Sequence, residues 1–235
     1  MPKKTPGKLK PPPAQRAFNR LPVRNWCATV RGVFHRLHSL DPATGRPRRP
    51  VSFSQRGHTR FDPVKGVGTL CLGESLSGVL LEVFDDRWGP VGDITRSLTK
   101  TELEEWWVTL VAVPAMTAFE AHKTNLSKLG TDLQLVSGDH AVAREWALRL
   151  MRHPAAVEGI QYPSRHDDSR VNLALFQVPR LLPEQYDDSV LPPAAAHALL
   201  ASRGQGKLVY GPAVLLRDHP ELDASLRELE IALIP

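Results

Sequence analysis

Cysteine is scarce in this sequence. The 235 residues include two cysteines, Cys27 and Cys71, which excludes a disulfide framework and a cysteine-rich zinc site. No run of about eighteen apolar residues occurs, so no transmembrane helix is expected. The basic start of the chain is not followed by the apolar stretch that a secretory signal needs. We therefore expect a cytoplasmic protein that does not contact a membrane.

The sequence motifs of several common enzyme classes are also missing. Gly66 and Gly68 are not followed by the third glycine of a dinucleotide-binding fingerprint, and residues 204–207 lack the spacing and the hydroxyl residue of a P-loop. The nine histidines are scattered, and His35 and His38 have no acidic or cysteine neighbour that would complete a metal site. No Gly-x-Ser-x-Gly elbow occurs. These absences argue against Rossmann enzymes, kinases, hydrolases and metalloenzymes, and no metal is expected.

Charge is distributed unevenly along the chain. Residues 1–60 carry 14 of the 30 Lys and Arg but one of the 25 acidic residues, so the rest of the chain is acidic although the whole has a net charge of +5. Residues 1–24 contain seven Lys and Arg, six prolines and no acid. This composition predicts a basic, disordered arm, followed by a folded domain over residues 25–235. The arm could contact nucleic acid weakly, or it could only keep the protein soluble.

The remaining chain contains short hydrophobic segments, some with the periodicity of a strand and others with that of a helix. Apolar and β-branched runs predict strands over 33–37, 69–72, 108–113, 159–162 and 171–176. Apolar residues at helical spacing predict helices over 76–84, 139–152 and 193–203. Ser75 and Asp139 are the expected N-caps of the first two helices. Thr101 and Glu104 have the spacing of a capping box, and Pro114 is expected to end its strand. Because strands and helices mix without strict alternation, the predicted fold class is α+β.

An ordered series of short segments runs through most of the chain. The segments are FHR at 34–36, RFDP at 60–63, GTLCL at 68–72, VLLEVF at 79–84, GIQYPSR at 159–165 and VNLALF at 171–176. In order and spacing, this series resembles the RES domain, a family named for a recurring arginine, glutamate and serine. The resemblance extends from about residue 33 to about residue 180.

The resemblance implies a fold, a substrate and a partner. RES domains of known function are bacterial toxins that consume NAD and that resemble ADP-ribosyltransferases in fold. We accordingly expect an ADP-ribosyltransferase-like α+β domain with two small sheets around a cleft. NAD would be the substrate rather than a resident cofactor. The usual partner of such a toxin is an antitoxin with an Xre-like helix-turn-helix domain, which would block the cleft.

The resemblance also assigns site residues by position. Arg36 and Arg60 match the two arginines of the family. Glu82 matches its glutamate, and Ser164 matches its serine. In this interpretation Arg36, Glu82 and Ser164 would act in catalysis, and both arginines would bind NAD.

Cys71 marks a departure from the family pattern, which usually has a tyrosine in this strand. A cysteine offers no aromatic face and only a weak hydrogen bond, so NAD binding should be weaker. Phe61 or Tyr162 could instead supply an aromatic surface for the nicotinamide ring. Cys71 is not expected to act as a nucleophile, because no histidine lies near it in sequence to lower the pKa of its thiol.

The matched residue types suit cleavage of the nicotinamide–ribose bond. An arginine fork binds pyrophosphate oxygens in a bidentate manner, so Arg36 and Arg60 would hold the pyrophosphate and the ribose. Cleavage builds positive charge on the ribose, which the Glu82 carboxylate would stabilise. Gly78, one helical turn earlier, should leave room for a ligand. Ser164 would orient either the carboxylate or the nicotinamide amide.

Two further functions stay open at this stage. The acceptor of the ADP-ribosyl group could be water, phosphate or a protein side chain, so ADP-ribosylation of a target protein is an alternative to hydrolysis or phosphorolysis of NAD. The alternative outside enzymes is a catalytically silent module. Such a module would bind nucleic acid or a partner through the basic residues 1–24 and 46–49.

Overall fold

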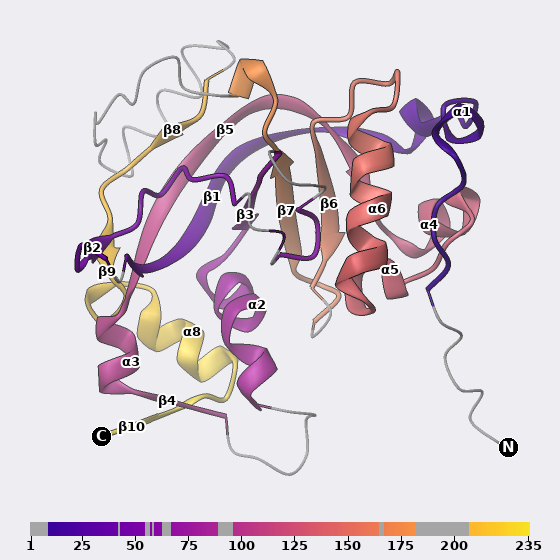
Figure 1. Cartoon of the computed structure of the whole chain (residues 1–235). Helices are drawn as coiled ribbons and strands as arrows, with labels where there is room; N and C mark the ends of the chain where they lie inside the picture. Colours follow the sequence, from indigo (N-terminus) through magenta and orange to yellow (C-terminus); the bar gives the residue numbers. More distant parts are fainter. Residues whose placement is uncertain are drawn as a thin grey trace, which may run out of the picture.

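A large mixed sheet forms the centre of the protein (Figure 1). The computed structural model describes residues 9–41, 43–54, 57, 59–62, 67–88, 96–164, 167–181 and 207–235. Across these residues, neighbouring strands of the sheet follow in the order β2 (Arg46–Pro47), β1 (Cys27–Asp41), β3 (Thr69–Gly73), β7 (Val171–Phe176), β6 (Gly159–Pro163), β5 (Trp106–Glu120) and β8 (Val209–Tyr210). β9 (Val214–Leu215) also pairs with β5. Because β1 pairs with β5 as well, the strands β1, β3, β7, β6 and β5 close into a ring.

The longest strands are β1 and β5, which form the antiparallel ribbon that arches across the molecule in Figure 1. Each has 15 residues, so both are much longer than the strands predicted over 33–37 and 108–113. The basic and polar residues of β1 hid its full length from the sequence pattern. In the structure Arg31 is exposed, whereas His35 and His38 are buried beside apolar residues such as Phe34, so the strand does not follow a simple polar and apolar alternation.

The prediction that Pro114 ends its strand is wrong. Val30 of β1 pairs with Met116 of β5, and Gly32 pairs with Val113, so β5 has one more residue than β1 between these two pairs. Pro114 lies in this β-bulge. A bulge interrupts the regular ladder of hydrogen bonds, so the missing N–H of proline costs little there.

The three short strands β3, β7 and β6 confirm the strands predicted from sequence. They are antiparallel, with Cys71 opposite Ala174 and Tyr162 opposite Asn172. Both faces of these strands are covered. One face packs into a cluster that contains Leu70, Leu72, Leu173 and Leu175, and the other into a cluster that contains Ile160, Tyr162, Ala174 and Phe176.

The helices α2 (Leu76–Trp88) and α6 (His140–Met151) confirm two further predictions. The Ser75 hydroxyl accepts a hydrogen bond of 3.1 Å from the backbone N–H of Gly78, at the start of α2. The Asp139 carboxylate accepts one from the first turn of α6. Both expected N-caps are therefore present.

The capping box lies two residues before the predicted position. Thr99 and Glu102 form it at the start of α3 (Lys100–Glu104), through hydrogen bonds in both directions. The pair Thr101 and Glu104 has the same spacing but lies inside the helix. Thr99 takes the role because it is the last, extended residue of the preceding strand, which is the conformation an N-cap needs.

The C-terminal segment lies against the helix α2 and builds a second sheet. It continues from β9 through η3 (Leu216–Asp218), α8 (Leu222–Glu228) and β10 (Ala232–Ile234), and β10 pairs in parallel with β4 (Ser97–Thr99). The predicted α+β class with two sheets is confirmed, although one sheet is large and the other has two strands. The helix predicted over 193–203 lies outside the described residues.

Three short helices complete the described elements: α4 (Lys123–Leu129), α5 (Gln134–Ser137) and η2 (Pro179–Leu181). α4 and α5 contribute leucines to the same cluster as α6. Among the described helices, none has the length and apolar character needed to cross a membrane.

Residues 9–24 contradict the expectation of a disordered arm. They include α1 (Gln15–Phe18) and the start of η1 (Val23–Trp26), and Phe18 and Val23 are completely buried. Phe18 meets the Trp146 ring edge to face at 6.0 Å, and Trp146 Nε1 donates a hydrogen bond of 2.9 Å to the Lys10 carbonyl. This part of the predicted arm therefore packs into the same core as α6; residues 1–8 lie outside the described part.

The sequence pattern did not reveal this packing, because the segment is mostly basic and the few apolar residues that make the contacts have no regular spacing. The arginines of the segment, Arg16, Arg20 and Arg24, are exposed. Contact of this segment with nucleic acid stays a prediction.

The buried aromatic ring gives the first testable prediction. Phe18→Ala should destabilise the protein by about 3–5 kcal/mol, because it removes a large side chain from a packed core. The matched change Arg20→Ala, two residues away on the exposed side, should alter the free energy of unfolding by about 0.5 kcal/mol or less. Denaturant unfolding of both variants checks this, and equal stabilities would show that residues 9–24 do not dock.

Candidate active site

The Glu82 carboxylate lies against the paired strands β6 and β7. Tyr162 Oη donates a hydrogen bond to Glu82 Oε1 at 3.4 Å, and Asn172 Nδ2 donates one to Oε2 at 3.2 Å. Tyr162 and Asn172 are directly opposite each other in the β6–β7 ladder, so one cross-strand pair holds both carboxylate oxygens. Burial, together with the charge of Glu82, raises the pKa of Tyr162 well above its ordinary value. The phenol therefore keeps its proton and remains a donor at neutral pH.

The amide of Asn172 has an unused acceptor at this point. Its Oδ1 is buried and has no hydrogen-bond partner among the described residues. A side chain at Gly73 would clash here, since its Cβ would lie 3.1 Å from Asn172 Oδ1 and 2.6 Å from Val79 Cγ1. At Gly78 a Cβ would lie 3.2 Å from the Ser75 hydroxyl. The space beside Gly78, which we expected to receive a ligand, is thus bordered closely by groups of the protein itself.

Arg36 is a half-buried cation whose Nε has unused hydrogen-bonding capacity. Its Nη1 donates a hydrogen bond of 2.8 Å to the backbone carbonyl of Cys71, which joins β1 to β3. Its Nε is buried without a partner among the described residues. Burial lowers the pKa of Arg36, while nearby acidic groups, including Asp62, partly offset this. An anion that reaches the guanidinium would supply the missing partner.

The Cys71 side chain is a half-buried thiol within electrostatic reach of Arg36 and Glu82. Burial raises its pKa to about 12, and the positive charge of Arg36 only partly opposes this. The thiolate is the nucleophilic form, so a raised pKa argues against a nucleophilic role, and the expectation that Cys71 is not a nucleophile stays a prediction. Because the thiol packs against the core, a tyrosine at this position would need space that its neighbours now occupy.

The segment that contains Arg60 is fixed by a buried carboxylate. Asp62 is completely buried and accepts hydrogen bonds from the Ser54 hydroxyl at 2.9 Å and from the backbone N–H of Thr59 at 3.2 Å. The Thr69 hydroxyl donates to the carbonyl of Phe61 at 3.0 Å. These bonds anchor the segment to β3 and place the charge of Asp62 near Arg36 and Cys71.

Arg60 itself is buried and points toward a different element. Its Nη1 donates a hydrogen bond to the Gly138 carbonyl, just before α6. The pKa of Tyr162 is raised overall, and the positive charge of Arg60 partly opposes that rise. The guanidinium therefore lies within electrostatic reach of Tyr162.

The expected aromatic surface is covered. Phe61 and Tyr162 meet edge to face, with ring centroids 4.9 Å apart, and both rings are almost completely buried. Tyr162 therefore contributes its hydroxyl at Glu82 rather than an open ring face.

Ser164 lines a neighbouring cavity. It is the first residue after β6, two positions beyond Tyr162, and its side chain is buried. The cavity, of about 650 Å³, is also lined by Leu81 of α2 and by Arg170. Glu82 is not among its lining residues. Arg36 and Glu82 thus both lie within electrostatic reach of Cys71, whereas Ser164 lines a cavity that it shares with Leu81, the neighbour of Glu82 on α2.

Sequence reasoning did not assign a role to Tyr162 at the carboxylate, nor any role to Asn172 or Asp62. The signal available for Asn172 was one polar residue in the otherwise apolar strand 171–176. Only the strand register shows that this amide faces Tyr162 and Glu82.

A histidine beside Arg36 makes the site sensitive to acid. His38 is buried, and its Nε2 lies 3.0 Å from the Thr109 hydroxyl, while its Nδ1 has no partner among the described residues. Burial, with the nearby charge of Arg36, lowers the pKa of His38 to about 4. The pKa of a histidine in the unfolded chain is about 6.5. As the pH falls, His38 therefore binds a proton in the unfolded chain at a higher pH than in the folded chain.

We expect this difference to appear as a loss of stability on acidification. His38 alone should reduce the free energy of unfolding by about 2 kcal/mol between pH 7 and pH 5. His38→Gln, which can still reach Thr109, should remove that part of the slope, whereas the change His122→Gln at an exposed position should not. Unfolding curves over this pH range measure both, and parallel slopes for all three proteins would contradict the assignment.

Comparisons with known proteins bear on the fold and the family of this chain. No curated protein matches the sequence. Among solved structures, the fold is similar to a chain of the M. tuberculosis MbcT–MbcA toxin–antitoxin complex, with a TM-score of 0.52 and 14% identity over 84% of this chain and 92% of that one. The family described as RES domain matches residues 33–192, a range that includes Arg36, Arg60, Cys71, Glu82 and Ser164. The chain belongs to the RES-domain family.

Proposed function

We propose that this protein is the toxin of a toxin–antitoxin pair and that it cleaves the nicotinamide–ribose bond of NAD. One observation carries the proposal: Cys71 lies within electrostatic reach of both a carboxylate with two neutral donors, Glu82, and a guanidinium whose buried Nε has no partner among the described residues, Arg36. A carboxylate and an arginine are the groups that an oxocarbenium-like transition state and a pyrophosphate require.

Glu82 would stabilise the positive charge that develops on the ribose. Tyr162 and Asn172 are uncharged donors, so their hydrogen bonds orient the carboxylate without adding a positive charge beside it. A preorganised carboxylate of this kind stabilises a transition state without having to reorient during the reaction. Ser164, on the wall of the adjoining cavity, would orient the nicotinamide amide.

Arg36 would bind a phosphate oxygen of NAD. A buried guanidinium without a negatively charged ligand is costly, and a pyrophosphate would provide both the charge and the acceptor that its Nε lacks. Arg60 would support the ribose side, because its charge already reaches Tyr162. Its hydrogen bond to the Gly138 carbonyl would fix its position.

Tyr162 would take over part of the role of the tyrosine that Cys71 replaces. A phenol hydroxyl reaches the glutamate from β6, across the sheet from β3. The absence of an open aromatic face favours weak NAD binding, as expected from the Cys71 substitution.

The partner would be an antitoxin with an Xre-like helix-turn-helix domain. The fold similarity to a chain from a toxin–antitoxin complex supports an antitoxin partner, and the Xre-like domain is what the family resemblance implies. Such a partner would inhibit by covering the cavity beside Ser164.

The first prediction from the proposed function concerns Glu82→Gln. This change keeps the size of the side chain but removes its charge, so nicotinamide release from NAD should fall by at least about a hundredfold. The free energy of unfolding should change by about 1 kcal/mol or less, since Glu82 is half-buried at the edge of the site. Glu145→Gln, at an exposed position of α6, is the matched control.

The assay is run with and without phosphate, and with and without candidate acceptor proteins. Turnover in buffer alone indicates hydrolysis, turnover that needs phosphate indicates phosphorolysis, and label transfer to a protein indicates ADP-ribosylation. An inert wild-type protein, or a Glu82→Gln variant with full activity, would overturn the proposed function.

A second prediction isolates the hydroxyl of Tyr162. Tyr162→Phe keeps the packing against Phe61 and removes the donor to Glu82 Oε1. A hydrogen bond to a charged group contributes about 1.5–3 kcal/mol, so kcat should fall by roughly ten- to a hundredfold with KM for NAD nearly unchanged. Tyr210→Phe, on β8 of the same sheet, should leave kcat unaffected. A rise in KM for NAD without a fall in kcat would show that Tyr162 binds NAD rather than positions Glu82.

A further inference from the structure

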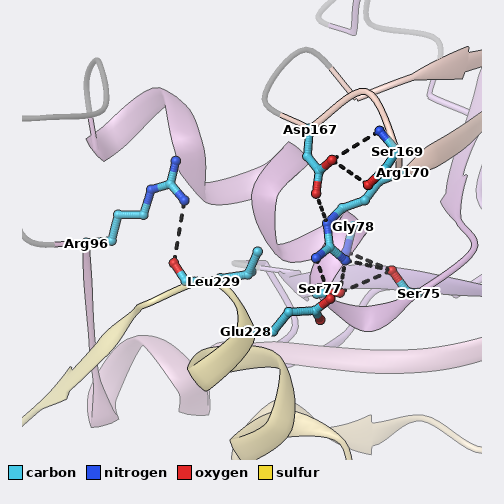
Figure 2. A network of polar contacts seen from close by, with 9 residues as sticks. All are labelled: Ser75, Ser77, Gly78, Arg96, Asp167, Ser169, Arg170, Glu228 and Leu229. Carbon is cyan, nitrogen blue, oxygen red and sulfur yellow. Dashed lines mark hydrogen bonds and ion pairs between the residues drawn. The ribbon is translucent and has the colours of Figure 1, made fainter.

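Arg170, at the turn into β7, connects three separate parts of the chain (Figure 2). Its Nε donates to Asp167 Oδ2 at 2.7 Å, and its Nη2 donates to Glu228 Oε1 at 2.6 Å. Its Nη1 reaches the hydroxyl groups of Ser75, at 3.4 Å, and Ser77. The Arg170 side chain is 12% exposed, whereas its acidic partners Asp167 and Glu228 are 33% and 54% exposed, so the arginine is shielded while the carboxylates border the solvent.

The contacts with Ser75 and Ser77 are made at the first turn of α2. The Ser75 hydroxyl is the N-cap that accepts from the Gly78 N–H, and the Ser77 side chain is buried. Glu82 lies on the same helix, one turn after Gly78. The position of the Arg170 guanidinium therefore fixes the end of the helix that carries the candidate catalytic carboxylate.

The backbone of Arg170 fixes Ser164 in turn. The Ser164 N–H donates to the Arg170 carbonyl at 2.8 Å, and the Arg170 N–H donates to the Asp167 carbonyl at 3.1 Å. The side-chain bond from Arg170 to Asp167 closes the same turn a second time. Ser164 and Glu82 are thus both tied to one residue.

The third connection reaches the C-terminal helix. Glu228 belongs to α8, whose leucines pack in the same cluster as Leu80 and Leu81 of α2. Nearby, Arg96 Nη1 donates to the Leu229 carbonyl at 3.5 Å (Figure 2). The Arg170–Glu228 pair adds a polar contact to a helix that apolar packing already holds.

We propose that Arg170 is a positioning residue, which holds the Ser164 turn and the first turn of α2 in the arrangement that catalysis needs. This inference rests on the proposed function. Its action is indirect, through Ser164 and Glu82, although Arg170 also lines the cavity beside them. The planar fork of arginine serves carboxylates and hydroxyls in several directions at once, which the single ammonium of lysine cannot do.

The decisive variant is Arg170→Lys, which keeps the charge and removes the fork. A small displacement of a reacting group is enough to cost up to about a hundredfold in rate. We expect kcat for nicotinamide release to fall by about ten- to a hundredfold, while KM for NAD changes by about threefold or less. Arg217→Lys is the matched control, because Arg217 makes an ion pair of 2.5 Å with Glu104 away from α2. It should leave kcat unchanged.

Two further variants separate positioning from stability. Ser77→Ala, which removes one contact at α2, should reproduce part of the kcat loss, and adding it to Arg170→Lys should have little further effect. Glu228→Gln should lower the melting temperature, and because Glu228 contacts both Arg170 and Ser77 it should lower kcat as well, but by less than Arg170→Lys does. A larger kcat loss in Glu228→Gln than in Arg170→Lys, or an unchanged kcat in Arg170→Lys, would overturn the positioning role.

Hydrogen exchange distinguishes failure of this inference from failure of the proposed function. A wild-type protein that releases no nicotinamide rejects the proposed function only. In that case the amides of Gly78 and Ser164 should still exchange faster in Arg170→Lys than in Arg217→Lys, with other core amides unchanged. Equal exchange at both amides would overturn the positioning role, whatever the activity of the wild type.

Discussion

The register of β6 against β7 is the constraint on which the candidate site depends. It places Tyr162 opposite Asn172, and those two donors hold the two oxygens of Glu82. A shift of one residue would turn both side chains to the other face of the sheet. The register is protected because both faces of these strands are buried, so any slip would expose apolar residues on one side and bury polar ones on the other.

The site also contains polar groups that the folded chain leaves unsatisfied. Arg36 Nε and Asn172 Oδ1 are buried without partners among the described residues, and each such group lowers the stability of the fold. Proteins retain unsatisfied groups of this kind where a ligand completes them. Elsewhere around the site, Asp62 and Arg170 each make several hydrogen bonds or ion pairs, which help to offset this loss of stability.

Local features of this fold were predictable from sequence, and contacts between distant segments were not. The N-cap at Ser75 depends on neighbouring residues and was predicted correctly. Pro114 was misjudged, because only its pairing partner reveals the bulge. Phe18 was missed in a proline-rich basic segment, since its burial depends on Trp146 far along the chain. For the candidate site, the family resemblance pointed to Glu82. Its hydrogen-bond donors Tyr162 and Asn172 could not be identified without the register of β6 against β7.

The ring of strands sets an order in which this protein can assemble. Arg36 enters with the first long strand, while Tyr162 and Asn172 enter with β6 and β7, which close the ring. These pairings join segments far apart in sequence, which makes them slow to form. During synthesis, a nascent chain that ends before β7 contains Glu82 but lacks its hydrogen-bond donor Asn172. The candidate site is therefore built late on the ribosome, and shorter fragments of the chain do not contain it.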